Sequence, residues 1–254
     1  IVYILENFNS LSTDLGSASK WWLHKSLQKF NEEFNKNLIQ KNDFDINFFK
    51  GNPEKIFSDL IKQIKINGIF WNRRYEARCV ERDTQIKSKF KQLNINIQTY
   101  NGKVLIEPWN IKGKQNQSLK VFTPYKNSLL RNHLIPKCLP LTKIKYHFKL
   151  SSSLKLNELN LISNNWMKKF DGIWHVGEKA ALIKLEKFIS NAIDNYDQDR
   201  NFPFKDGTSK LSPHLHFGEI SPVKIWNMTC DNKNYEEISN GRKVFLSEII
   251  WREF

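Results

Sequence analysis

The sequence predicts an α/β domain built on a parallel sheet, followed by an all-helical domain. Up to Tyr100, apolar runs of strand length alternate with segments of helical spacing, which is typical of a parallel sheet wound by crossover helices. After Gly177, every periodic segment has helical spacing. Regular periodicity fades between these two parts and prolines accumulate there, which indicates a long connection.

Four segments of the first part are predicted to be strands. Three are apolar runs and the last alternates between apolar and polar residues: Ile1–Leu5, Phe44–Phe49, Gly68–Trp71 and Ile95–Tyr100. No GxGxxG or GxxxxGK[ST] motif follows any of them, so the sequence does not support a dinucleotide or P-loop site. Because the chain opens inside a strand pattern, we expect it to begin within a domain.

Three helices are predicted between these strands. The first has apolar side chains every three or four residues, and Ser17 or Ser19 is its expected cap. The second begins at Pro53 behind Asn52, since proline suits the first helical position. The third spans Ala77–Leu93 and carries charges on its outer face.

The C-terminal part is predicted to contain four helices. An apolar stripe marks the first of them: Leu182, Leu185, Phe188, Ile189, Ala192 and Ile193. Two more begin at Ser212-Pro213 and Ser221-Pro222, with serine as the cap and proline at the first helical position. The last begins near Lys243 and still runs at Phe254, so we expect it to continue beyond this sequence.

Composition and charge narrow the class of protein. The chain has 254 residues, and 40 Lys and Arg against 26 Asp and Glu give a net charge of +14. With 40% hydrophobic residues, the composition is that of a folded protein. The positive charge favours a polyanionic partner, either nucleic acid or an anionic membrane surface. No apolar run approaches the roughly 20 residues that span a bilayer, and no signal peptide is evident, so we expect a cytoplasmic protein.

Cysteines and histidines give no support for a metal site. Cys79, Cys138 and Cys230 are widely separated, which fits neither a disulfide framework nor a CxxC site. Only His214 and His216 are close enough in sequence to share a ligand. We therefore expect no metal.

The segment 206–213 has the composition of an anion-binding turn. Gly207 permits a tight turn, and Thr208, Ser209 and Lys210 follow it directly before Leu211 and a predicted helix start at Ser212. Hydroxyls, a cation and free backbone N–H groups at a helix start suit a pyrophosphate. The alternative is that these residues only form a turn and a helix cap.

Two groups of helical spacing combine aromatic and charged side chains. Glu248, Trp251 and Arg252 share one face of the last helix, which suits a planar, hydrogen-bonding ligand such as a flavin or a nucleobase. The alternative is an intrahelical Glu–Arg pair beside a core tryptophan. Tyr196 and Arg200 are also four residues apart, and they either contact a ligand and a phosphate or form a solvated helix end.

A series of short strings resembles the DNA photolyase/cryptochrome family. The strings are found in the family's order over nearly the whole chain: Trp21–His24, Trp71–Glu76, Glu81–Asp83, Glu107–Trp109, Lys120–Pro124, Asp206–Pro213, Leu215–Pro222 and Glu248–Phe254. The set is most similar to class I photolyases that act on cyclobutane pyrimidine dimers. The resemblance implies an antenna domain over residues 1–104, a linker over 105–174 and a helical FAD-binding domain over 175–254. It also implies that the chain is about half of a family member, truncated at both ends, and without repair activity by itself.

The same resemblance implies roles for individual residues. Tyr196 and Phe245 match flavin-contacting positions, and Arg252 matches an arginine on the flavin side. The residues that match the loop for the FAD phosphates are Thr208, Ser209, Lys210, Leu211 and Ser212. Arg200 matches an arginine that contacts the DNA backbone, and Glu248 and Trp251 match the catalytic carboxylate and the aromatic residue that face the dimer and contact the DNA.

The function that the resemblance implies is light-driven repair. Reduced FAD donates an electron to a cyclobutane pyrimidine dimer that is flipped out of UV-damaged DNA. A second antenna chromophore, either a folate or a deazaflavin, and a monomeric state are further expectations. The alternatives are a cryptochrome-type photoreceptor and, in a different class, a non-catalytic basic nucleic-acid-binding protein. The presence of Arg200, Glu248 and Trp251 favours repair.

Overall fold

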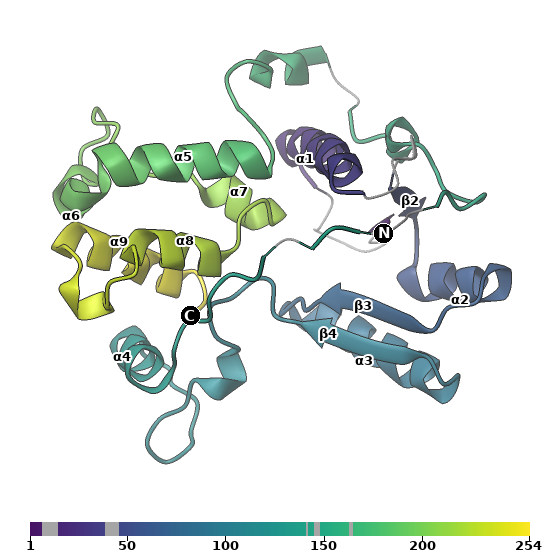
Figure 1. Ribbon diagram of the computed structural model, residues 1–254, viewed down its shortest axis with the longest axis horizontal. Coiled ribbons are helices and arrows are strands. Elements are labelled where there is room, and N and C mark those ends of the chain that lie inside the picture. Colours follow the sequence, from purple (N-terminus) through teal and green to yellow (C-terminus); the bar gives the residue numbers. More distant parts are fainter. Residues whose placement is uncertain (7–14, 39–45, 141, 145–147, 163–164) are drawn as a thin grey trace. The chain divides into compact units, whose positions relative to one another are not determined.

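The structure is a computed structural model that describes residues 1–6, 15–38, 46–140, 142–144, 148–162 and 165–254 (Figure 1). The chain divides into two compact units. The first consists of residues 1–70, 75–98 and 141–178, and the second of residues 71–74, 99–140 and 179–254. The proposed domain boundaries at residues 104 and 174 stay a prediction.

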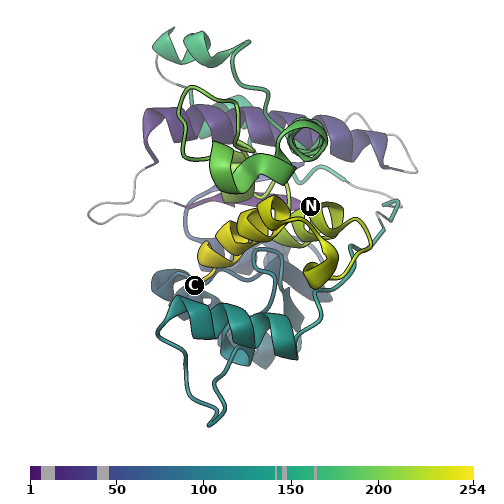
Figure 2. The ribbon, with the colours of Figure 1, turned by 90° about the vertical axis from the view of Figure 1, so that its left-hand side faces the viewer.

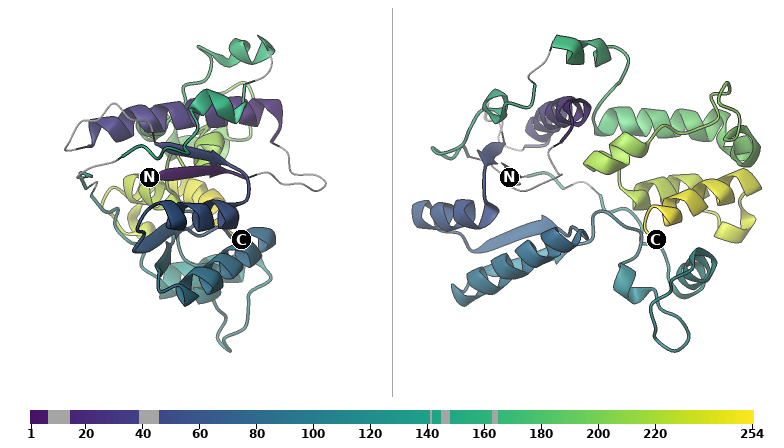
Figure 3. Two further views of the ribbon diagram at one scale, coloured as in Figure 1. Left: turned by 90° about the vertical axis from the view of Figure 1, so that its right-hand side faces the viewer. Right: turned by 180° about the vertical axis from the view of Figure 1, so that it is seen from behind.

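The first unit contains a parallel strand pair. Strands β1 (Val2–Leu5) and β2 (Asn47–Lys50) lie side by side with Val2 opposite Asn47 (Figure 3). Asn47 is buried in this pair, and its side chain is satisfied by backbone groups of a distant segment. Its amide N donates to the carbonyl of Phe148 at 3.1 Å, and its Oδ1 accepts from the amide of Leu150 at 2.8 Å. The predicted strand over 44–49 is confirmed from Asn47 onward, and residues 44 and 45 lie outside the described residues.

The three predicted helices of this part are present: α1 (Ser17–Lys36), α2 (Pro53–Gln63) and α3 (Ala77–Gln92). Asn52 caps α2 as predicted, and its Oδ1 accepts from the amides of Glu54 at 2.9 Å and Lys55 at 3.2 Å. The predicted cap of α1 is wrong. Gly16 occupies the cap position, and both Ser17 and Ser19 already lie inside the helix.

A second strand pair consists of β3 (Gly68–Asn72) and β4 (Asn96–Tyr100). Both strands were predicted, and they alternate with helices as the α/β class requires. The described residues nevertheless form two separate two-stranded sheets, not one continuous parallel sheet.

The second unit is helical. Its helices are α4 (Phe122–Asn132), α5 (Glu178–Asn191), α6 (Tyr196–Asp199), α7 (Ser212–Phe217), α8 (Pro222–Cys230) and α9 (Asn240–Trp251). The described residues of the two units also contain short 3₁₀ turns: Pro108–Asn110, Leu156–Leu159, Asn165–Phe170, Ile193–Asn195 and Tyr235–Glu237. The predicted connection over 105–174 therefore contains an eleven-residue helix, α4.

Of the helix starts predicted in this unit, one is confirmed and two differ by a few residues. Ser221 caps α8 as predicted, with its Oγ 3.1 Å from the amide of Lys224. Ser212 is the first residue of α7 and not its cap, because Leu211 holds the cap position. Helix α9 begins three residues before Lys243, since the Ser239 hydroxyl caps it.

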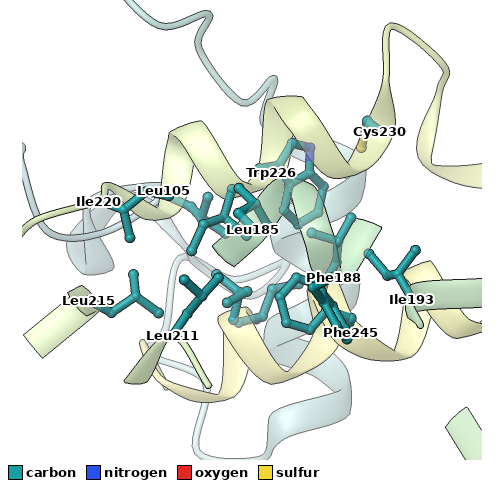
Figure 4. Close-up of a cluster of buried hydrophobic side chains, with 14 of the residues drawn as sticks. Leu105, Leu185, Phe188, Ile193, Leu211, Leu215, Ile220, Trp226, Cys230 and Phe245 are labelled. Atoms are coloured by element: carbon teal, nitrogen blue, oxygen red, sulfur yellow. The ribbon is translucent and has the colours of Figure 1, made fainter. Parts of the chain in front are cut away.

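The core of the second unit lies between α5, α8 and α9. Leu185, Phe188, Trp226 and Phe245 are buried there and point toward one another (Figure 4). The apolar stripe of α5 supplies Leu185 and Phe188, whereas Ile193 of the predicted stripe lies beyond the helix and is buried in the following turn. The core fixes α9 against the other helices.

A close backbone contact sets α9 against the turn that precedes α6. A Cβ atom on Gly241 would lie 2.5 Å from the carbonyl oxygen of Asp194, so only glycine permits this approach. The Asp194 carboxylate also accepts from the Ser239 hydroxyl at 2.5 Å and from Nε of Arg242 at 3.0 Å. These contacts hold α6 and α9 next to each other (Figures 1 and 2).

Within the described ranges, no helix is long and apolar enough to cross a membrane. The same residues contain no group of three or more His, Cys, Asp or Glu that could hold a metal ion.

Candidate functional site

Three aromatic rings form the floor of the candidate site. The rings of Tyr196 and Phe245 meet edge to face with centroids 5.4 Å apart, and Phe188 lies 5.7 Å from Tyr196 and 4.9 Å from Phe245. Tyr196 and Phe245 are only 8% and 3% exposed. Burial raises the pKa of the Tyr196 phenol above its usual range. Phe245 thus lies in the core, where it supports Tyr196 from below.

Arg200 and Glu248 form an ion pair above this floor. Nη1 of Arg200 lies 2.6 Å from Oε1 of Glu248, and its guanidinium is stacked over the Tyr196 ring at 5.2 Å. The hydrogen bond to Glu248 raises the pKa of the Arg200 guanidinium above its usual value. Helical spacing predicted that Tyr196 and Arg200 share a face, but the partnership with Glu248 joins residues 48 positions apart.

Trp251 lies one turn after Glu248 at the end of α9. It is 49% exposed, and one face of its indole is stacked on Phe122 with centroids 3.7 Å apart and an interplanar angle of 10°. No role at the site was predicted for Phe122, which belongs to the string Lys120–Pro124 of the predicted connection.

The alternative of an intrahelical Glu–Arg pair beside a core tryptophan does not hold. Glu248 bonds Arg200, Trp251 is half-exposed, and Nη1 of Arg252 donates to the carbonyl of Lys103 at 2.8 Å. The flavin-side role expected for Arg252 stays a prediction, since the described contact of its side chain is with a backbone carbonyl of the same unit.

Glu253 carries a half-buried carboxyl that no sequence pattern indicated. Its two carboxyl oxygens lie 2.7 and 2.8 Å from the amide nitrogen of Leu105, which donates to them. Burial raises its pKa to about 8, against the opposing effect of the Leu105 hydrogen bond. Arg252 and Glu253 therefore tie the end of α9 to residues 103–105.

The loop 206–212 lies against α6. A side chain on Gly207 would meet Asp199, because an added Cβ would be 2.7 Å from the Asp199 Cβ and 3.0 Å from its carbonyl oxygen. Thr208 and Ser212 are exposed, Ser209 is half-buried, and Leu211 points into the core. The glycine thus allows the loop to approach α6 while Thr208 and Ser212 stay exposed.

Positive charge gathers at this loop. Lys210 has a left-handed backbone with φ of 51°, and its Nζ lies 2.5 Å from the Asp206 carboxylate. The Lys210 hydrogen bond and charge lower the pKa of Asp206, and Lys187 and Lys184 of α5 act in the same direction. These three lysines and the hydroxyls of the loop 206–212 together form a donor set that suits phosphate groups.

The donor chemistry of this unit fits the phosphates of FAD. The hydroxyls of Thr208, Ser209 and Ser212 and the Lys210 ammonium are suitable donors, whereas Leu211 contributes packing only. Of the other expected flavin neighbours, Tyr196 has one face of its ring under the Arg200 guanidinium, and Phe245 packs against Tyr196 from the core.

Comparison with known proteins gives consistent matches. A family model described as DNA photolyase matches residues 1–143. The deoxyribodipyrimidine photo-lyase of Agrobacterium fabrum is 34% identical over 248 residues, which cover 94% of this chain and 50% of that protein. The chain therefore spans about half the length of such relatives.

Solved structures match the whole chain. The crystal structure of a class III photolyase from Agrobacterium tumefaciens has a TM-score of 0.85 and 34% sequence identity, and it covers 100% of this chain and 51% of that one. Class III is the class of that protein, and the similarity of this chain to class I stays a prediction. A cryptochrome from Synechocystis has a TM-score of 0.75 at 20% identity over 100% of this chain and 54% of its own, which supports the fold alone.

Proposed function

The chain belongs to the DNA photolyase family, and from this premise we propose that the whole protein repairs cyclobutane pyrimidine dimers in UV-damaged DNA with light. One observation carries the proposal. Arg200, at the end of α6, pairs with Glu248 of α9, and the half-exposed Trp251 lies one turn further along α9. A guanidinium, a carboxylate and a half-exposed indole are suited to holding a base outside a duplex by hydrogen bonds and stacking.

Several residues of the second unit are proposed to hold FAD. Thr208, Ser209 and Ser212 donate hydrogen bonds to its phosphates, and Lys210 adds a positive charge. Tyr196 lines the same region from α6. When bound and reduced, FAD would supply the electron that splits the dimer and would take it back once the ring has opened.

The DNA contacts follow from the chemistry of each side chain. Arg200 bonds a backbone phosphate, and the net positive charge of the chain adds affinity that does not depend on the DNA sequence. Trp251 stacks on the extruded pyrimidines with the face that Phe122 leaves uncovered. Glu248 accepts hydrogen bonds from N–H groups of the damaged bases. Arg200 exchanges its Glu248 partner for the phosphate, which leaves the Glu248 carboxylate available to the bases.

The test uses the full-length protein. A duplex with one thymine dimer is incubated with purified protein under blue light and in the dark, and the dimer content is measured. We expect loss of dimers in the light only, and unchanged dimers with a flavin-loaded protein would contradict the proposal. Glu248→Gln should lower the repair yield per absorbed photon, whereas Glu186→Gln, on the exposed side of α5, should not. An equal yield in both variants would remove Glu248 from the mechanism.

The two alternatives give different results in the same experiment. A cryptochrome-type photoreceptor would show flavin absorbance and a light response without loss of dimers. A non-catalytic basic nucleic-acid-binding protein would show neither flavin bands nor a light response. We further propose that the protein is cytoplasmic and monomeric and that it holds a second chromophore, folate or deazaflavin. Size-exclusion chromatography would test the monomeric state, and the absorption spectrum of the purified protein would test the chromophore.

A further inference from the structure

The string Lys120–Pro124 has been given no role of its own so far, yet the structure places its Phe122 at the candidate site. Phe122 is the first residue of α4, and its ring lies parallel to the indole of Trp251 with centroids 3.7 Å apart. The residues that meet here are 129 positions apart, and α4 and α9 lie next to each other (Figures 1 and 2).

Contacts of α4 with the rest of the second unit fix the position of Phe122. On the α4 side, Tyr125 and Leu129 are buried, and the Ser128 hydroxyl donates to the carbonyl of Lys112 at 2.7 Å. Between the helices, Nζ of Lys126 lies 3.4 Å from Oγ of Ser247. The ring of Phe122 is therefore part of a fixed surface.

The end of α9 is held independently. Arg252 bonds the carbonyl of Lys103, Glu253 accepts from the amide of Leu105, and the Phe254 ring meets the Trp251 ring edge-on at 5.7 Å. The indole thus has Phe122 over one face and Phe254 at its edge. Because Trp251 is still 49% exposed, the face opposite Phe122 is open.

We propose that Phe122 is a positioning residue for dimer recognition: it fixes the plane of the Trp251 indole and closes one of its faces, so that a flipped pyrimidine stacks on the other. This rests on the proposed function. An indole that is already ordered loses less rotational freedom when a base stacks on it, which increases affinity without a new contact to the DNA. Phe122 itself touches no base, and its effect is restricted to ligands that use Trp251.

The variant Phe122→Leu tests this, since leucine keeps an apolar side chain at a half-buried position but removes the flat face. In the full-length protein we expect Phe122→Leu to lower affinity for a dimer-containing duplex by roughly 3- to 10-fold, the worth of an aromatic pair. Affinity for the same duplex without a dimer should change less than about twofold, and FAD content should stay the same. Phe122→Tyr should restore the wild-type preference. An equal loss on both duplexes, or no loss, would overturn the inference.

A second measurement separates this inference from the proposed function. Near-ultraviolet circular dichroism reports the ordered environment of an indole without any DNA. If Phe122 orders Trp251, the difference spectrum of Phe122→Leu against wild type should resemble that of Trp251→Phe, and Phe122→Tyr should show little difference. A wild-type protein without preference for dimers would refute the proposed function and the recognition role together, while unaltered dichroism in Phe122→Leu would refute the positioning role alone.

Discussion

The contact between Gly241 and the turn before α6 leads to a prediction whose size follows from the structure. In Gly241→Ala, the new methyl group would press on the carbonyl oxygens of Ile193 and Asp194, and the second of these would be 2.5 Å away. Both are backbone atoms, so no side chain can rotate to make room. Helix α9 would have to move by about 1 Å to restore ordinary van der Waals contact.

The expected cost combines two opposing effects. Overpacking of this kind destabilises by about 1–3 kcal/mol, and the rigid neighbours place this site at about 3 kcal/mol. Alanine recovers up to about 1 kcal/mol because it favours the helix more than glycine does. We therefore expect Gly241→Ala to lower the free energy of unfolding by about 2 kcal/mol.

Urea unfolding followed by tryptophan fluorescence measures this change, with Gly16→Ala as the matched control. Gly16 has no atom within 4 Å of an added Cβ and a φ of −60°, so the only expected cost of its substitution is that alanine is a poorer helix cap than glycine, about 1 kcal/mol or less. A shift of α9 should also weaken the Arg200–Glu248 pair, which NMR of the Arg200 guanidinium would detect. Equal stability of the two alanine variants would refute the argument.

Three further predictions concern buried polar groups. Because burial raises the pKa of Glu253 from 4.5 to about 8, the folded chain keeps a proton that the unfolded chain has released, so the free energy of unfolding should fall as pH rises from about 4.5 to about 8. Glu253→Gln should remove that slope, and an unchanged slope would refute this cause. Tyr125→Phe should stabilise by up to about 1 kcal/mol in thermal unfolding, because the buried hydroxyl has no hydrogen-bond partner among the described residues, and a loss of stability would show that it has one. Asn47→Ala should destabilise by roughly 2–3 kcal/mol in urea unfolding, since it leaves buried backbone groups unpaired, and a loss below about 1 kcal/mol would contradict that.

The sequence located most elements but not all of their caps, and the backbone explains the difference. Asn52 and Ser221 precede their helices in an extended conformation, with ψ of 121° and 149°, so their side-chain oxygens reach the first free amides. Gly16 holds the same extended position before α1 and has no side chain to use. Leu211 before α7 has ψ of −5°, which leaves Ser212 inside the helix. A serine near a helix start is therefore only a candidate for the cap.

In the candidate site, only the pairs of residues that lie within one turn of the same helix could be predicted from the sequence. Tyr196 with Arg200, and Glu248 with Trp251, follow from helical periodicity. The bond from Arg200 to Glu248 and the stack of Phe122 on Trp251 depend on how helices pack, and no local pattern in the sequence encodes those contacts. The environment of the Glu253 carboxyl could not be predicted for the same reason, because it depends on contacts with residues 103–105.

The bonds that Asn47 makes across the first unit constrain the order in which this protein can fold during synthesis. Besides β1, strand β2 has partners from far downstream: Phe148 and Leu150 bond the Asn47 side chain, and the backbone of Leu154 bonds that of Phe48. On the ribosome, β2 can therefore complete its contacts only after about a hundred more residues have been made. Closing so long a loop slows folding far more than it weakens the final structure. In the interval, β1 and β2 offer unpaired edges to other chains, so the nascent chain should depend on chaperones until residue 154 has left the exit tunnel.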